Sequence, residues 1–208
     1  MKHIRVENYR TSENSYIIYD EHTLDGAVID PGNPVSDILD AANKNSIKIR
    51  YILITHCHYD HIEYLEELRE KTGAPLVSGD KASINITDPN INVSYAGLGY
   101  ELSAKKSDII LNDNEILKIG DSEVKCIYTP GHTNCGVCYL TDDGIFVGDT
   151  LFLRNCGRWD LPTGDEQTLM KSIRERLYTL PDDTKVYPGH GEGTSIGYEK
   201  KFNFIVKA

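Results

Sequence analysis

Histidine and aspartate gather in one short segment of the chain. Residues 55–61 read THCHYDH, so His56, His58, Asp60 and His61 lie close together in a chain that has seven histidines in all. Imidazole nitrogens and carboxylate oxygens are ligands of Zn²⁺, and also of iron and manganese. Such groups repel or desolvate one another at close range unless a cation bridges them. The segment therefore predicts a metal site.

Three further candidate ligands follow apolar segments elsewhere in the chain. His132 stands in PGHTN after VKCIYT, Asp149 in GDTLF after GIFV, and His190 in PGHGE after KVY. A glycine lies beside or near each of them, which permits a tight turn at the end of a strand and can aim the side chain into a shared cleft. Seven candidate ligands exceed the four of one tetrahedral ion, and they suffice for two ions that share a carboxylate.

Strands and helices alternate in a way that could position these residues. The spacing of apolar residues predicts strands at 4–9, 14–20, 26–32, 49–55, 115–120, 122–129, 136–141, 144–150 and 184–191, and helices at 34–46, 61–73, 165–180 and 196–206. Residues 75–86 read as a strand and a short helix. Residues 88–107 have little periodicity, and we interpret them as a surface loop and a candidate lid. We expect one α+β domain over residues 1–208, with two sheets packed between outer helices.

Composition disfavours several classes of function. The net charge of −10 disfavours nucleic acid as a partner, because phosphate binding usually needs a basic face. No apolar run approaches the length of a membrane span, and MKHIRVENYR lacks the apolar centre of a signal peptide. The five cysteines are an odd number in a chain with ample apolar residues, which argues against a disulfide framework. We expect a cytoplasmic protein; its oligomeric state is not indicated.

The motifs THCHYDH, TPGHT, GDTLF and YPGHG, in this order, resemble the metal motifs of the metallo-β-lactamase superfamily. The resemblance extends from GAVIDPG to YPGHG and implies a four-layer αββα sandwich, with two mixed sheets and the metals at one edge. It also implies two divalent ions, most simply zinc, with a bridging hydroxide that Asp60 helps to orient. The implied ligands are His56, His58 and His132 for one ion, Asp60, His61 and His190 for the other, and Asp149 for both.

Residues 148–191 are similar to the glyoxalase II branch, the hydroxyacylglutathione hydrolases, and especially to its short bacterial relatives without a C-terminal helical domain. This similarity implies hydrolysis of a small thioester. Arg158 follows a Cys-Gly pair at the position that contacts substrate in that branch, and it could pair with a carboxylate. The β-lactamases usually carry Cys in place of Asp149, which argues against antibiotic hydrolysis. The thiol carrier stays open, because the missing helical domain supplies much of the glutathione site.

Other activities fit the same motifs. Persulfide dioxygenases share the CGR segment and bind a single iron at the equivalents of His56, His132 and Asp149. A lactonase would use the same tetrahedral chemistry as a thioesterase. Non-hydrolytic di-iron scaffolds commonly carry Glu at the position of His58, so the sequence disfavours them. Metal identity and stoichiometry would separate these possibilities.

Overall fold

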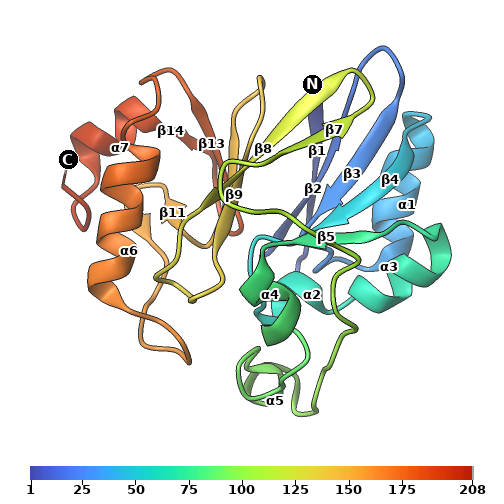
Figure 1. Ribbon diagram of the computed structural model, residues 1–208, viewed down its shortest axis with the longest axis horizontal. Coiled ribbons are helices and arrows are strands. Elements are labelled where there is room, and N and C mark those ends of the chain that lie inside the picture. The colour runs from blue at the N-terminus through green and yellow to red at the C-terminus, as the bar shows by residue number, and fades with distance from the viewer. Residues whose placement is uncertain (208) are drawn as a thin grey trace.

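A computed structural model describes residues 1–207, and a pair of six-stranded sheets forms its centre (Figure 1). The first sheet begins as an antiparallel meander and continues with parallel strands, because helices connect its later members. Its strands, in spatial order, are β1 (Lys2–Glu7), β2 (Asn14–Tyr19), β3 (Asp25–Ile29), β4 (Lys48–Leu53), β5 (Leu76–Ser78) and β6 (Ile109–Ile110).

The second sheet brings three strand ends to a common edge. Strand β9 pairs antiparallel with both β8 and β10, and β10 pairs parallel with β13, so β8, β10 and β13 run in one direction. Their carboxyl ends therefore lie at the same edge of the sheet. The strands, in spatial order, are β14 (Thr194–Ser195), β13 (Lys185–Pro188), β10 (Ile145–Gly148), β9 (Val137–Leu140), β8 (Ser122–Tyr128) and β7 (Ile116–Ile119).

Helices cover the outer faces of the two sheets (Figure 1). Helices α1 (Val35–Lys44) and α3 (Leu65–Thr72) bury Ile38, Leu65 and Leu68 against the first sheet. Helices α6 (Glu166–Ser172), η1 (Ile173–Leu177) and α7 (Ile196–Phe202) cover the second sheet with a similar apolar face. A third apolar core lies between the sheets and contains Ile18, Leu53, Val124, Tyr139 and Phe146. Three cores between four layers confirm the predicted αββα sandwich.

Two predicted helices are interrupted. The helix predicted at 61–73 divides into α2 (Tyr59–Ile62) and α3, because the Tyr64 backbone N–H donates to the Pro31 carbonyl, 3.1 Å away, rather than to its own helix. Its predicted end at Gly73 is confirmed, with φ at 67°. The helix predicted at 165–180 ends in the π-helix η1, where Tyr178 N donates to Ile173 O at 2.8 Å.

The segment 88–107 is more ordered than a plain surface loop. It contains α5 (Ser94–Leu98), and the side chains of Asn92, Ser94 and Ala104 are buried. Helix α4 (Asp80–Asn85) precedes it. The hairpin of β11 (Leu151–Phe152) and β12 (Asn155–Cys156), together with β14, was not predicted, because two-residue strands leave no periodicity to detect.

The helices and the cysteines bear on the predictions about membranes and disulfides. Within residues 1–207, no helix combines the length and the apolar character needed to cross a membrane. All five cysteines are free and buried. None of them therefore forms part of a disulfide framework in this structure.

Candidate metal centre

The seven predicted ligands meet at the edge where the strand ends converge. The segment from His56 to His61 follows β4 and enters α2, and His132, Asp149 and His190 follow β8, β10 and β13. Gly148 has a φ of 49°, and the turn that it forms brings Asp149 into the site. A Cβ atom at Gly148 would lie 2.2 Å from Thr55 Oγ1, so only glycine fits this close crossing of the two sheets.

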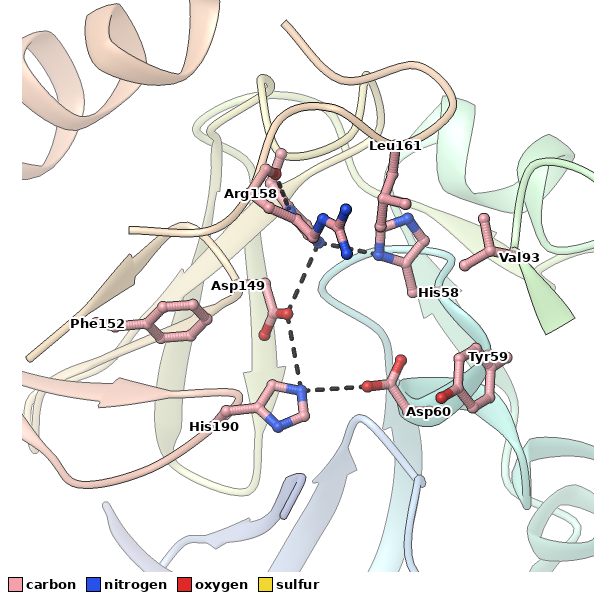
Figure 2. Close-up of a pocket in the computed structure, with 10 residues that line it drawn as sticks. His58, Tyr59, Asp60, Val93, Asp149, Phe152, Arg158, Leu161 and His190 are labelled. Carbon is pink, nitrogen blue, oxygen red and sulfur yellow. Dashed lines mark hydrogen bonds and ion pairs between the residues drawn. The ribbon is translucent and has the colours of Figure 1, made fainter. Parts of the chain in front are cut away.

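The ligand atoms form two groups that share Asp149. His56, His58 and His132 can each offer an atom within 4.8 Å of the others, and so can Asp60, His61 and His190. Asp149 Oδ1 lies 3.3 Å from His61 Nε2, and Asp149 Oδ2 lies 3.7 Å from the Nε2 atoms of both His132 and His190. Figure 2 shows Asp149 between His58 on one side and His190 and Asp60 on the other. One carboxylate thus reaches both groups.

Several buried polar atoms in the site lack hydrogen bonds. They are His56 Nε2, His58 Nε2, His61 Nε2 and Asp149 Oδ1. A buried polar atom without a partner is costly, and such atoms are rare in folded proteins. His61 Nε2 and Asp149 Oδ1 have only each other, as an ion pair at 3.3 Å, and the four atoms together are arranged as the ligands of a cation would be. The donor set of imidazole and carboxylate groups fits two divalent ions.

Four of the five candidate ligand histidines form a hydrogen bond through Nδ1 to a residue outside the ligand set, whereas His58 Nδ1 pairs with His132 Nε2 at 2.9 Å. A ring that uses Nδ1 for a protein partner presents Nε2 to a metal, which fixes both the orientation and the tautomer of the ring. The four pairs are His56 Nδ1 with Thr55 Oγ1 at 3.0 Å, His61 Nδ1 with Asp30 Oδ2 at 2.9 Å, His132 Nδ1 with Arg158 O at 2.7 Å, and His190 Nδ1 with Ser12 O at 3.1 Å.

The electrostatic environment differs between the two groups of candidate ligands. Burial lowers the pKa of His56 and His132, and it lowers the pKa of His58 to about 3. These three rings are therefore neutral at physiological pH and free to bind a metal. Burial also opposes protonation of His61, but the carboxylates of Asp149, Asp30 and Asp60 outweigh it and raise the pKa of that ring. Negative charge is thus concentrated around the second group.

Asp30 is a site residue that the sequence reasoning missed. Its carboxylate accepts hydrogen bonds from Thr55 N and Thr55 Oγ1, both at 2.6 Å, in addition to the bond from His61. With these donors its oxygens are occupied, so Asp30 orients His61 and the start of the THCHYDH segment. The signal was present, because Asp30 follows a strand and precedes Pro31-Gly32, the same pattern that identified the later ligands.

The loop that carries His190 is attached to the first sheet. Asn14 N donates to Gly189 O at 2.7 Å, and Asn14 Nδ2 donates to Pro188 O at 3.0 Å and to Gly191 O at 2.9 Å. Tyr16 Oη donates to Pro188 O at 2.8 Å. Residues Asn14 and Tyr16 of β2 therefore hold the loop that carries His190 in position.

A cavity of about 370 Å³ opens onto the ligands. Tyr59, Val93, Phe152, Arg158 and Leu161 line it together with the site residues (Figure 2). The Arg158 side chain is exposed, and its guanidinium makes a bidentate pair with Asp160, at 2.7 and 2.8 Å. Arg158 also lines an adjacent cavity of about 470 Å³ formed by residues 155–160. Its side chain thus lies at the junction of two spaces.

The chain was compared with known proteins. The family description "Metallo-beta-lactamase superfamily" matches residues 8–190. A relative from Bacillus subtilis, named probable metallo-hydrolase YqgX, is 35% identical over 90% of this chain and 89% of its own length. The structure of the BLEG-1 B3 metallo-beta-lactamase superposes with a TM-score of 0.93 at 29% identity and covers both chains fully. The structure of ETHE1 from Myxococcus xanthus has a TM-score of 0.84 at 30% identity over 99% of this chain and 84% of its own.

The fold, the paired ligand groups and the matching relatives agree with one another. The match covers the whole span of the four sequence motifs, from before Asp30 to His190. The superfamily binds divalent metals, and the His and Asp clusters of this chain could hold such ions. The chain belongs to the metallo-beta-lactamase superfamily.

Proposed function

We propose that this metallo-hydrolase cleaves small thioesters, as the hydroxyacylglutathione hydrolases do, with two divalent ions. The observation that carries the proposal is the pair of ligand groups joined by Asp149, which opens onto a cavity with Arg158 at its rim. When bound, two divalent ions supply hydroxide near neutral pH and stabilise the charge that develops on the carbonyl oxygen. Zinc is our proposed metal, because hydrolysis needs no change of oxidation state; iron and manganese suit the same ligands.

The protein groups around the ligands have distinct roles in this proposal. Asp60 Oδ2 lies 3.2 Å from His190 Nε2, which leaves Oδ1 to accept a hydrogen bond from the nucleophile and orient it. No serine or cysteine nucleophile is required. The guanidinium of Arg158 would exchange Asp160 for a carboxylate of the thiol carrier, since both partners offer the same bidentate geometry.

Metal analysis of protein purified without added metal, paired with assays on the same sample, tests the proposal. The substrate panel contains acyl thioesters, a lactone, a β-lactam and a persulfide, with oxygen uptake recorded for the last. About two zinc ions per chain with thioester hydrolysis would support the proposal. About one iron per chain, with oxygen consumption and no hydrolysis, would overturn it.

Two activities other than thioester hydrolysis are supported by similar solved structures. A mononuclear iron persulfide dioxygenase would need only His56, His132 and Asp149, and the similarity to the ETHE1 structure gives it some support. The similarity to BLEG-1, named a B3 metallo-beta-lactamase, weighs against our argument from Asp149 that antibiotic hydrolysis is disfavoured. The β-lactam therefore belongs in the panel as a real competitor to the thioester.

A further inference from the structure

One wall of the cavity has a strained backbone. Val93 has φ 54° and ψ 24°, in the left-handed region. A β-branched residue rarely adopts this conformation, because its Cβ substituents crowd the backbone. Within residues 1–207, Val93 and Thr163 are the β-branched residues with positive φ, and of these two it is Val93 that lines the metal cavity. Strain of this kind persists where the surroundings impose it, and it is concentrated at ligand-binding sites.

The neighbours of Val93 hold it in this conformation. Asn92 and Ser94 are fully buried. Asn92 Nδ2 donates to Leu102 O at 2.7 Å, Leu102 N donates to Ser94 Oγ at 2.9 Å, and Ser94 N donates to Asn92 Oδ1 at 3.0 Å. These bonds tie both sides of Val93 to Leu102, which lies in the irregular part of the segment after α5. The conformation is therefore imposed by flanking residues and not by Val93 itself.

The same segment is fixed to the metal-binding loop. Tyr59 N donates to Asn92 O at 2.9 Å, and Tyr59 stands between the ligands His58 and Asp60. A Cβ atom at Gly97 would lie 2.1 Å from Tyr59 Cζ, so α5 packs directly on the Tyr59 ring. Val93 is thus held at a constant position relative to the ligands.

Val93 lies at one end of the reaction space. In Figure 2, Val93 and Leu161 lie next to His58, whereas Phe152 lies on the far side of Asp149. Arg158 connects the metal cavity to the second cavity formed by residues 155–160. A thiol carrier that binds Arg158 has room in the second cavity, so the acyl group would stay in the metal cavity, where the isopropyl group of Val93 is part of the wall near His58.

We propose that Val93 determines acyl specificity, and that its side chain, held by Asn92 and Ser94, excludes long acyl groups. This inference rests on the proposed thioester hydrolysis. An apolar pocket discriminates between neighbouring chain lengths by roughly tenfold or more, so one valine at its end is enough to set a preference. The substrate class is a thioester with a short apolar acyl group on a carboxylate-bearing thiol.

Val93→Gly is the informative variant, because glycine accepts the left-handed backbone and removes the side chain. Its kcat and KM are compared with those of the unaltered, metal-loaded protein on acetyl, butyryl, hexanoyl and octanoyl thioesters of one thiol. We expect the octanoyl-to-acetyl ratio of kcat/KM to rise roughly tenfold, with metal content unchanged. Tyr95→Ala is the control, because Tyr95 is exposed on α5, two residues after Val93, and does not line the cavity, so it should leave the ratio unchanged.

Binding of straight-chain carboxylates, measured by calorimetry, makes the test independent of turnover. Carboxylates bind divalent metals and are the acyl products of the proposed reaction. If the unaltered protein hydrolyses no thioester, the proposed function fails, yet Val93→Gly should still strengthen octanoate binding relative to acetate. Equal changes for every chain length, in hydrolysis or in binding, would overturn the role of Val93 and leave it a structural residue.

Discussion

The two halves of the sandwich contribute to the metal centre in different ways. The first half supplies four of the seven candidate ligands from one continuous segment after β4, and α2 holds Asp60 and His61 in place. The second half supplies one residue from the end of each of three strands, namely His132, Asp149 and His190. Local backbone geometry is enough to keep the first set together. The second set depends on the pairing of β8, β9, β10 and β13.

The ligand groups do not follow the boundary between the halves. His132 belongs with His56 and His58, His190 belongs with Asp60 and His61, and Asp149 lies between the two groups. Each group of candidate ligands therefore needs both halves. We expect substitutions in the second half to have separable effects, because each of its ligands serves a different part of the centre.

The largest effect is expected for Asp149→Ala, which removes the carboxylate that reaches both groups. Loss of both metals or of their correct spacing should lower kcat/KM by roughly 10³-fold, equivalent to about 4 kcal/mol of barrier height. Metal analysis and kinetics on the same preparation provide the measurement, with the exposed Asp121→Ala as a matched control. Normal turnover with a full metal complement would contradict the shared role of Asp149.

The next largest effect is expected for His190→Ala, which should affect only one of the two ligand groups. His190→Ala should leave about one ion per chain, since His56, His58 and His132 stay intact, and it should strongly reduce hydrolysis. The exposed His22→Ala, outside the centre, should retain both ions. Elemental analysis decides the result. If the unaltered protein and His190→Ala both bind about one ion per chain, the centre is mononuclear, which would support the dioxygenase alternative. If both bind about two, His190 is not a required ligand.

A smaller effect is expected from the residue that orients a ligand. Asp30→Asn places an amide where Thr55 and His61 both donate, so at least one donor loses its acceptor. Loss of such an orienting bond typically weakens metal affinity about 10- to 100-fold. Competition with a chelator of known affinity measures the change, and the exposed Asp37→Asn should show none. An unchanged affinity would mean that α2 alone orients His61.

The smallest effect concerns a contact between the halves. Asp20 at the end of β2 accepts a hydrogen bond from Ser122 Oγ of β8 at 2.6 Å. That bond, together with bonds from the Thr23 and His22 backbone, lowers the pKa of Asp20. A carboxylate with a lowered pKa stabilises the fold when ionised, and this contribution is lost as the pH falls through the folded-state pKa.

Asp20→Asn should therefore destabilise the protein at about pH 7, and the difference should shrink once the pH falls below about 4. Urea unfolding of chelator-treated protein at several pH values measures it, with the exposed Asp40→Asn as the control. A difference that is constant with pH would show that geometry, and not charge, makes the contribution of Asp20.

The contrast between the halves also explains what could be predicted from the sequence. The crowding of His56, His58, Asp60 and His61 needs no tertiary information, and the strand ends at His132, Asp149 and His190 could be inferred from apolar runs followed by glycine turns. The four-layer architecture followed from the order of the elements. Each of these features is encoded within a few neighbouring residues.

Features set by distant contacts could not be predicted. The break between α2 and α3 depends on a bond from Tyr64 to Pro31, and the conformation of Val93 depends on bonds from its neighbours to Leu102. A β-branched residue would not be assigned a left-handed backbone from its type. In both cases tertiary structure overrides local preference.

The attachment of the His190 loop to Asn14 and Tyr16 has a consequence for how the centre matures. Ribosomes make the chain from its amino end, so residues 12–16 emerge long before the loop that they hold. During that interval the second ligand group is incomplete, and the early histidines have no partner from the late strands. Contacts of such long sequence separation also form slowly. Metal capture therefore belongs after release of the chain, and a pulse of labelled metal should enter finished protein only.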